Sequence, residues 1–197
     1  MWELITIKQY YEMIDLIQNE KDPNLITEGL LKMLYNIDMG DIPVTQIGYY
    51  MKKLDFIKTE PKRAPLKKVY EIDGMKFKPS TDLTKITTSQ FIDYQEFLKR
   101  NDYKHILNCF LIKEGESYGD NDYSEFLWDN MKFVDYQAVL FFYQDLLDRL
   151  LINTLRSSEK MLKKMYRKEK DPKKKEELLE KIVQLRLAKN EVGSQML

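Results

Sequence analysis

The chain has 197 residues, of which 43% are hydrophobic and 32% are charged, and its formal net charge is zero. Seven Gly and six Pro are few for this length, and together with the high charge content they favour helices. A balanced total charge argues against a protein dedicated to nucleic acid, because such proteins usually carry a clear basic excess. A single cysteine excludes an intramolecular disulfide.

The charge is unevenly distributed along the chain. Residues 1–57, 58–85, 86–155 and 156–197 carry net charges of −4, +4, −6 and +6. This alternation favours self-association or docking between unlike faces. Residues 1–4 lack the basic and apolar regions of a secretory signal, so we expect none.

One short phrase occurs twice and predicts two helix starts. Residues 5–10 read ITIKQY and residues 86–91 read ITTSQF. In both, a Thr precedes a Gln by three positions, which is the spacing of a capping box, and apolar residues flank the pair as in a hydrophobic staple. We expect helices over 6–20 and 87–100. The repeated phrase has two alternative explanations, which are the shared chemistry of helix starts and an internal duplication.

Two further helices are predicted in the first segment. Asp22-Pro23 places a capping residue before a Pro at the first helical position, so a second helix starts there. Gly40 and Pro43 interrupt the chain. A third helix is expected over 44–56.

Residues 58–85 predict a basic linker and a β-hairpin. Asp73-Gly74 lies between alternating apolar and charged residues, which is the strongest short hairpin signal. One isolated hairpin is marginal in water, so it must pack on helices or join a partner's sheet. The apolar residues that we expect the hairpin to bury are Val69, Ile72, Met75 and Phe77. Simple alternation does not place all four on one side, and we therefore expect burial of both faces.

The second half repeats the helical pattern. A helix over 102–112, a polar loop over 114–122, a short helix over 123–131 and a long helix over 135–168 follow the helix at 87–100. The inward residues predicted for the helix at 87–100 are Phe91, Tyr94, Phe97 and Leu98. Charged residues interrupt the apolar run 138–155, which excludes a membrane span there and indicates a buried helix.

The last segment predicts a helical hairpin. Pro inside a helix costs about 3 kcal/mol but is tolerated at the first position, so Asp171-Pro172 should end one helix and start another. A continuous kinked helix is the alternative. We expect Leu178, Ile182 and Leu185 to fold back over Leu155, Leu162 and Met165. Such an arm is marginal alone, which indicates that a partner orders it.

The predicted fold is mainly α. Two small helical subdomains, 1–57 and 86–155, are joined by the linker and hairpin at 58–85, and a charged helical arm occupies 156–197. The predicted hairpin turn is Asp73 and Gly74. The candidate partner-binding residues on the arm are Lys163, Lys164, Arg167, Lys168, Leu178, Ile182 and Leu185.

No pattern of residues indicates a catalytic, cofactor or metal site. The only histidine, His105, has no second His or Cys at metal-ligand spacing. Cys109 follows one helical turn later, but its apolar setting opposes a reactive thiolate. Asp120-Asn121-Asp122 does not match the spacing of a calcium loop, so a solvated loop or a contact for a basic partner is favoured. We predict a protein that is not an enzyme and needs no cofactor.

The basic run 160–175 has two interpretations. It could contact phosphates, or it could be the solvated face of a helical arm. The second interpretation is favoured here, and nucleic acid is therefore the less favoured partner.

The order of three motifs resembles a family of phage proteins. These motifs are Tyr-x-Ile-Asp-Gly-x-Lys-Phe at 70–77, Ile-Thr-x-x-Gln-Phe-Ile-Asp at 86–93, and a Phe-Phe pair in the long helix at 139–155. Residues 4–155 resemble small structural and assembly proteins from the tail and neck gene clusters of tailed, especially crAss-like, bacteriophages. The arm has no counterpart in this resemblance.

The resemblance implies a non-enzymatic virion structural or assembly protein of the neck, tail or portal-proximal region. Its partners would be other phage structural proteins in a multi-subunit assembly, built in the host cytoplasm and retained in the virion, with no membrane involved. The alternatives are a transient tail-assembly chaperone and a nucleic-acid-associated protein that uses the basic arm.

Overall fold

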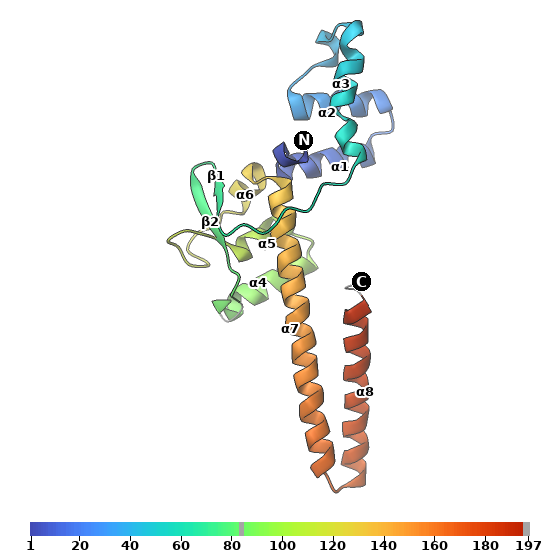
Figure 1. Cartoon of the computed structure of the whole chain (residues 1–197), viewed down its shortest axis with the longest axis vertical. Coiled ribbons are helices and arrows are strands. Elements are labelled where there is room, and N and C mark those ends of the chain that lie inside the picture. Colours follow the sequence, from blue (N-terminus) through green and yellow to red (C-terminus); the bar gives the residue numbers. More distant parts are fainter. Residues whose placement is uncertain (83–84, 195–197) are drawn as a thin grey trace. The chain divides into compact units, whose positions relative to one another are not determined.

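The structure, a computed structural model, describes residues 1–82 and 85–194, with side chains up to residue 187. The described residues form a mainly helical protein with one small antiparallel sheet and a C-terminal helical hairpin (Figure 1), which confirms the predicted fold class. Contacts group the chain into two units, Met1–Leu140 and Phe141–Leu197. The finer four-part division stays a prediction.

The first helices start where the sequence predicts. A short 3-10 turn, η1 (Trp2–Leu4), precedes α1 (Ile7–Asn19), and α2 (Pro23–Tyr35) follows. The Gln9 amide donates to Thr6 Oγ1 at 3.3 Å, and the Thr6 amide donates to Gln9 Oε1 at 3.0 Å, so the capping box is complete. Asp22 accepts from the Asn24 amide at 2.9 Å and caps α2 in the same manner.

Close packing joins α1 to α2. A Cβ at Gly29 would lie 2.6 Å from Leu16 Cδ2, so a larger residue there would require the Leu16 side chain to move. The two helices then enclose a cluster of buried residues, which consists of Met13, Leu30, Leu31 and Leu54. This cluster is the apolar core of the N-terminal part of the first unit.

The third helix is broken into pieces, so the prediction of one helix over 44–56 was wrong in detail. After η2 (Met39–Asp41) the chain forms η3 (Val44–Gln46), α3 (Ile47–Lys53) and η4 (Asp55–Lys58). Leu54 at the last junction is buried, and Ile57 packs against the same cluster. The tighter turn beyond α3 therefore brings both side chains to the core.

The sheet contains one more strand than predicted. β1 (Tyr70–Ile72) and β2 (Met75–Pro79) form the hairpin, and β2 also pairs with β3 (Leu111–Lys113). Asp73 and Gly74 form the turn with φ of 46° and 76°, the left-handed region that a two-residue hairpin turn requires. The helix predicted over 102–112 accordingly ends at Phe110 and continues as β3.

Within the chain the hairpin buries one face, and the expected burial of its other face by a partner stays a prediction. Tyr70 opposes Phe77 and Ile72 opposes Met75, and cross-strand partners point to the same side of a sheet. Tyr70, Ile72 and Phe77 are buried, while the opposed pair on the other face, Glu71 and Lys76, is exposed. Tyr70, which the prediction did not name, takes an inward position, and Val69, which precedes β1, is 38% exposed.

Three helices pack around this sheet. They are α4 (Thr88–Lys99), α5 (Tyr103–Phe110) and α6 (Ser124–Asn130). The Phe77 ring packs on Phe126 of α6, with ring centroids 5.9 Å apart. The second predicted capping box is also present, because the Gln90 amide donates to Thr87 Oγ1 at 3.2 Å.

The inner face of α4 agrees with the prediction in part, because Tyr94 and Phe97 are half-buried and Tyr94 packs on Phe110 with ring centroids 5.0 Å apart. Phe91 and Leu98 are 45% and 41% exposed, whereas the polar Gln90 is buried. Gln90 Nε2 donates to the carbonyl of Cys109, which ties the start of α4 to the end of α5. A buried polar group needs such a partner, and here the partner lies on another helix.

The long helix α7 (Phe133–Lys168) contributes its first turns to the first unit. Backbone hydrogen bonds join the Ile7 amide to the Met131 carbonyl at 3.0 Å and the Phe133 amide to the Ile5 carbonyl at 2.8 Å. The Phe133 ring stacks on Tyr10. The remainder of α7 and the last helix, α8 (Pro172–Ser194), belong to the second unit.

Candidate functional site

The second unit is a helical hairpin whose turn is held by two carboxylates. Glu169 Oε1 accepts from the backbone amides of Lys170 and Asp171 at 2.8 and 3.0 Å. Asp171 Oδ1 accepts from the Lys173 amide at 2.9 Å and caps α8, whose first residue is Pro172. The chain therefore turns back at Asp171-Pro172, as predicted, and α8 runs back along α7 (Figure 1).

The inner side of the hairpin carries most of the predicted apolar residues. Ile182 is only 4% exposed, and Leu178, Leu185, Leu155 and Leu162 are half-buried. Because Ile182 is buried, it can contact a partner only if the hairpin opens. Met165 was also predicted to lie inward, but it is 49% exposed.

One carboxylate connects the two helices. Arg186 Nε on α8 donates to Glu159 Oε1 on α7 at 2.9 Å, and Lys163 Nζ lies 2.7 Å from the same oxygen. The Glu159 side chain is only 12% exposed. Two cations therefore compensate for the loss of water around this charge.

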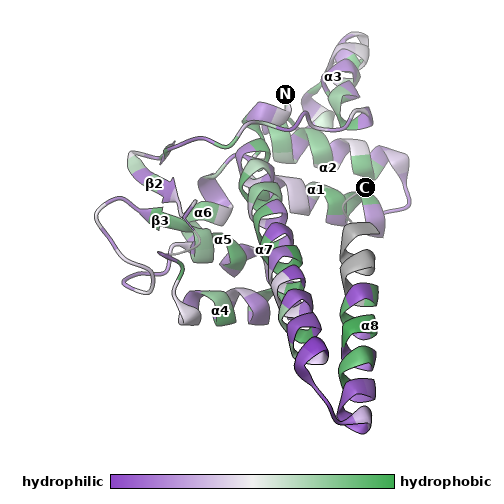
Figure 2. Cartoon of the chain, turned by 60° about the horizontal axis from the view of Figure 1, so that its bottom comes forward, coloured by the Kyte–Doolittle hydropathy of each residue, from purple (hydrophilic) through white to green (hydrophobic). Residues whose placement is uncertain are grey.

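The outer flank of α8 carries a row of apolar residues that the sequence analysis did not select. Leu179, Val183 and Leu187 are 49%, 47% and 58% exposed. Their spacing of four residues places them on one flank of the helix. Figure 2 shows that hydrophobic residues recur along the described part of α8. We call these three residues the α8 row.

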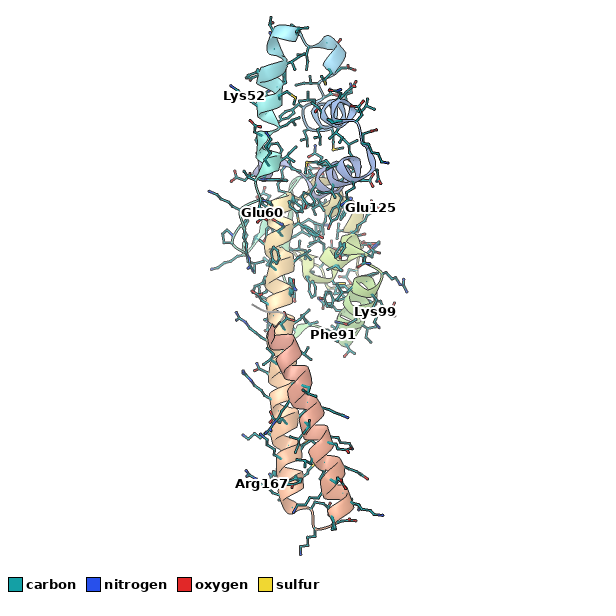
Figure 3. The ribbon with its side chains drawn as sticks, turned by 90° about the vertical axis from the view of Figure 1, so that its right-hand side faces the viewer. Lys52, Glu60, Phe91, Lys99, Glu125 and Arg167 are labelled. Atoms are coloured by element: carbon teal, nitrogen blue, oxygen red, sulfur yellow. The ribbon has the colours of Figure 1, made fainter. Side chains whose placement is uncertain are left out.

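The outer face of α7 is basic near the turn. Lys164, Arg167 and Lys168, all predicted as partner contacts, are exposed, and Lys160 is exposed one turn earlier. Arg167 lies near the tip of the hairpin (Figure 3). The fourth predicted cation, Lys163, is instead engaged with Glu159. Residues 195–197 of the predicted arm and residues 83–84 of the predicted linker lie outside the described residues.

A polar pocket of about 220 Å³ lies in the first unit beside His105. His105 Nδ1 is 2.7 Å from Asp102 Oδ2, and its Nε2 is 3.8 Å from Asp122 Oδ2. The ring stacks on Phe97. Asp102 also accepts from the His105 amide at 3.3 Å and caps α5, so the pair has a structural role at a helix start.

A chain of hydrogen bonds connects the buried Cys109 to Tyr118 and Asp93, which line this pocket. Tyr118 Oη donates to Asp93 Oδ2 at 2.7 Å, and the Cys109 thiol lies 3.8 Å from the same Tyr118 oxygen. Because the tyrosine proton points to Asp93, the thiol donates to Tyr118. Burial raises the pKa of Cys109 to about 12, so the thiol stays protonated and is a poor nucleophile at neutral pH.

The acidic loop predicted over 114–122 is engaged within the chain. Hydrogen bonds from Lys113, Asn121 and Tyr123 hold the Glu116 carboxylate and lower its pKa to about 2. Asp120 accepts from the Ser117 amide at 2.7 Å. Among the described residues, no group of three His, Cys, Asp or Glu side chains is arranged to hold a metal ion.

The first unit also contains an apolar pocket of about 420 Å³. It lies among residues of α1, α2, α3 and η4, beside the core cluster around Leu54. Ile17 and Met51 at this pocket are 37% and 43% exposed, and its charged lining consists of Lys52 and of Lys58 paired with Asp55 at 2.6 Å.

No protein-family model, curated protein or solved structure matches this chain. Within the described residues, no helix combines the length and the apolar composition needed to cross a membrane.

Proposed function

We propose that this chain is a non-enzymatic structural or assembly protein that docks onto other proteins through the outer flank of its helical hairpin. The α8 row is the observation that carries the proposal. Three large apolar side chains on one flank remain about half exposed, although the neighbouring face of α8 already has Ile182 buried. Full burial of a leucine contributes about 1.5–3 kcal/mol, so covering a half-exposed one contributes about half of that, and covering the row favours association.

The local structure of the hairpin supports this role. The turn is fixed by Glu169 and Asp171, and the two helices are linked by Glu159 and Arg186. Such a prefolded element presents its outer side chains without first ordering a disordered segment. Less conformational entropy is then lost on binding.

The kind of assembly that we propose rests on the sequence motifs at 70–77, 86–93 and 139–155. Their resemblance to phage tail and neck cluster proteins makes a tailed-phage particle the proposed assembly. Other phage structural proteins are the proposed partners, with assembly in the host cytoplasm and retention in the virion. A transient tail-assembly chaperone would use the same flank and leave before the particle is complete.

Quantitative mass spectrometry of purified particles tests this proposal. If the chain is a permanent component, it will be present at a fixed ratio to the major structural proteins after stringent purification. A chain that is needed for assembly but absent from finished particles would instead support the chaperone. Normal particles made without the chain would contradict both roles.

A further inference from the structure

We infer that the outer face of α7 forms a second binding surface that contacts the phosphate backbone of nucleic acid. This inference is separate from docking through the α8 row. We call this surface the basic face. Its four members are Lys160, Lys164, Arg167 and Lys168, and all are exposed.

The acidic side chains at the end of α7 and in the turn make local contacts. Glu159 is held by Lys163 and Arg186, Glu169 accepts from the amides of the turn, and Asp171 caps α8. The exposed acids of the hairpin, Glu176, Glu177 and Glu180, lie on α8. Among the side chains that the structure describes, none of the four cations of the basic face has an ion-pair partner.

The four basic residues on α7 lie along one side of the helix. Lys160, Lys164, Arg167 and Lys168 follow one another at intervals that place them on one side of a helix. They span eight residues, or about 12 Å, over which one DNA strand carries about three phosphates.

The stability of α7 does not explain why these basic residues lie on the same side of the helix. Lys160 and Lys164, and again Lys164 and Lys168, are like charges four residues apart, which destabilises a helix by about 0.2–0.5 kcal/mol per pair. Binding a polyanion would remove this repulsion.

The composition of the face favours phosphate over an acidic protein surface. Three of its four members are lysine, which is depleted in protein interfaces, whereas Arg and aromatic residues are enriched there. Lysine is a compact, hydrated point charge that neutralises phosphate without demanding a fixed geometry. The face should therefore bind duplexes of different sequence with similar affinity.

A membrane surface fits less well. An amphipathic helix that lies in a lipid interface needs a broad apolar face beside its cations. On this part of α7 the inward side, with Leu162 and Tyr166, is half-buried in the hairpin. Met161 and Met165 are the exposed apolar residues that remain between Lys160 and Lys168.

The test measures binding of the full chain to a short fluorescein-labelled DNA duplex by fluorescence anisotropy, over a series of potassium chloride concentrations. One variant neutralises the basic face on α7 with K160Q, K164Q, R167Q and K168Q. A matched control neutralises four exposed lysines of the first unit with K21Q, K32Q, K52Q and K62Q. Both variants change the net charge equally, and circular dichroism verifies that both retain their helices.

We expect wild type and control to bind alike and the basic-face variant to bind at least about tenfold more weakly. The slope of log affinity against log salt should become shallower by about 0.9 for each phosphate contact that is removed. Equal weakening of both variants would show a net-charge effect and overturn the inference. Absence of wild-type binding at low salt would also overturn it. Displacement of the duplex by polyglutamate of equal charge would assign the face to an acidic protein instead.

Discussion

Arg186 on α8 and Glu159 on α7 form an ion pair across the helical hairpin, with 2.9 Å between Arg186 Nε and Glu159 Oε1. The Glu159 side chain is 12% exposed and the Arg186 side chain is 54% exposed, so the carboxylate lies on the inner side of the pair. Lys163 contacts the same oxygen. Loss of the carboxylate charge would leave two cations close together.

Glu159→Gln should therefore destabilise the hairpin by about 1 kcal/mol, a value reduced for the exposure of Arg186. Hydrogen exchange of the α8 amides measures this opening directly. Glu176→Gln, at an exposed position of the same hairpin, is the control and should change exchange little. In a double-mutant cycle with Arg186→Gln, strictly additive effects would show that the pair does not couple the helices.

The two capping boxes should differ in their contribution to stability. Gln9→Ala removes the hydrogen bond from the Thr6 amide to the Gln9 side chain but keeps the one from the residue 9 amide to Thr6 Oγ1, so it should cost about 0.5–1 kcal/mol. Gln90→Ala removes the box of α4 and also leaves the buried carbonyl of Cys109 without its donor, so we expect a cost of about 2–3 kcal/mol. Urea unfolding of both variants checks this order. Equal costs would mean that the contact to Cys109 contributes nothing.

Substitutions at two glycines, Gly74 in the hairpin turn and Gly48 in α3, should change stability in opposite directions. Gly74 has φ of 76°, and a β-branched residue is strained there, so Gly74→Val should lower the thermal midpoint. Gly48 lies in α3 with open space around its Cα, so Gly48→Ala should raise stability by up to about 1 kcal/mol. If both changes were tolerated equally, Gly74 would not require its left-handed conformation.

Features that depend on neighbouring residues could be predicted from the sequence. The capping boxes at Thr6 and Thr87, the start of α8 at Pro172 and the turn at Asp73 each follow from the chemistry of a few adjacent side chains. These signals are local, so they survive in any tertiary context. They were sufficient for the mainly helical fold class and for the helical hairpin.

Features that depend on contacts between distant residues could not be predicted from the sequence. β3 forms because residues 111–113 pair with β2, although the predicted helical pattern extends to residue 112. Gln90 is buried and Phe91 is exposed because the carbonyl of Cys109 accepts from Gln90. For the candidate site, the spacing of Leu179, Val183 and Leu187 was visible in the sequence. The sequence alone did not show which flank of α8 faces α7.

Cys109 should be unreactive in the folded chain. Its pKa of about 12 lies above the ordinary value of 9.0, so the folded state holds the thiol proton more tightly than the unfolded state. Stability from this group is therefore lost as pH rises from 9 toward 12. Iodoacetamide should modify the thiol slowly at neutral pH and rapidly in urea. Rapid modification of the folded chain would contradict the buried, protonated thiol.

The same residue separates a structural role from a chemical one. Cys109→Ala should retain docking and lose about 1 kcal/mol of stability from reduced packing. His105→Gln should also retain docking, since its contact with Asp102 lies at the start of α5. Loss of function from both variants, with folding intact, would indicate a catalytic or metal-binding role for this pocket.

Docking of the α8 row onto other proteins of an assembly can be blocked by charge on the row. Leu179→Glu with Val183→Glu places two negative charges on the row and leaves the buried Ile182 unchanged. The control, Lys181→Gln with Gln184→Glu, changes the net charge by the same amount at exposed positions of α8 outside the row. Both variants should keep the helical content of the wild type.

The most direct measurement is the amount of each variant incorporated into purified particles when it replaces the wild-type chain, determined by quantitative mass spectrometry. Burial of a charged group without a partner opposes association, so the row variant should be incorporated at least about tenfold less than wild type, and the control at the wild-type level. Incorporation of the row variant at the wild-type level would contradict docking through the α8 row.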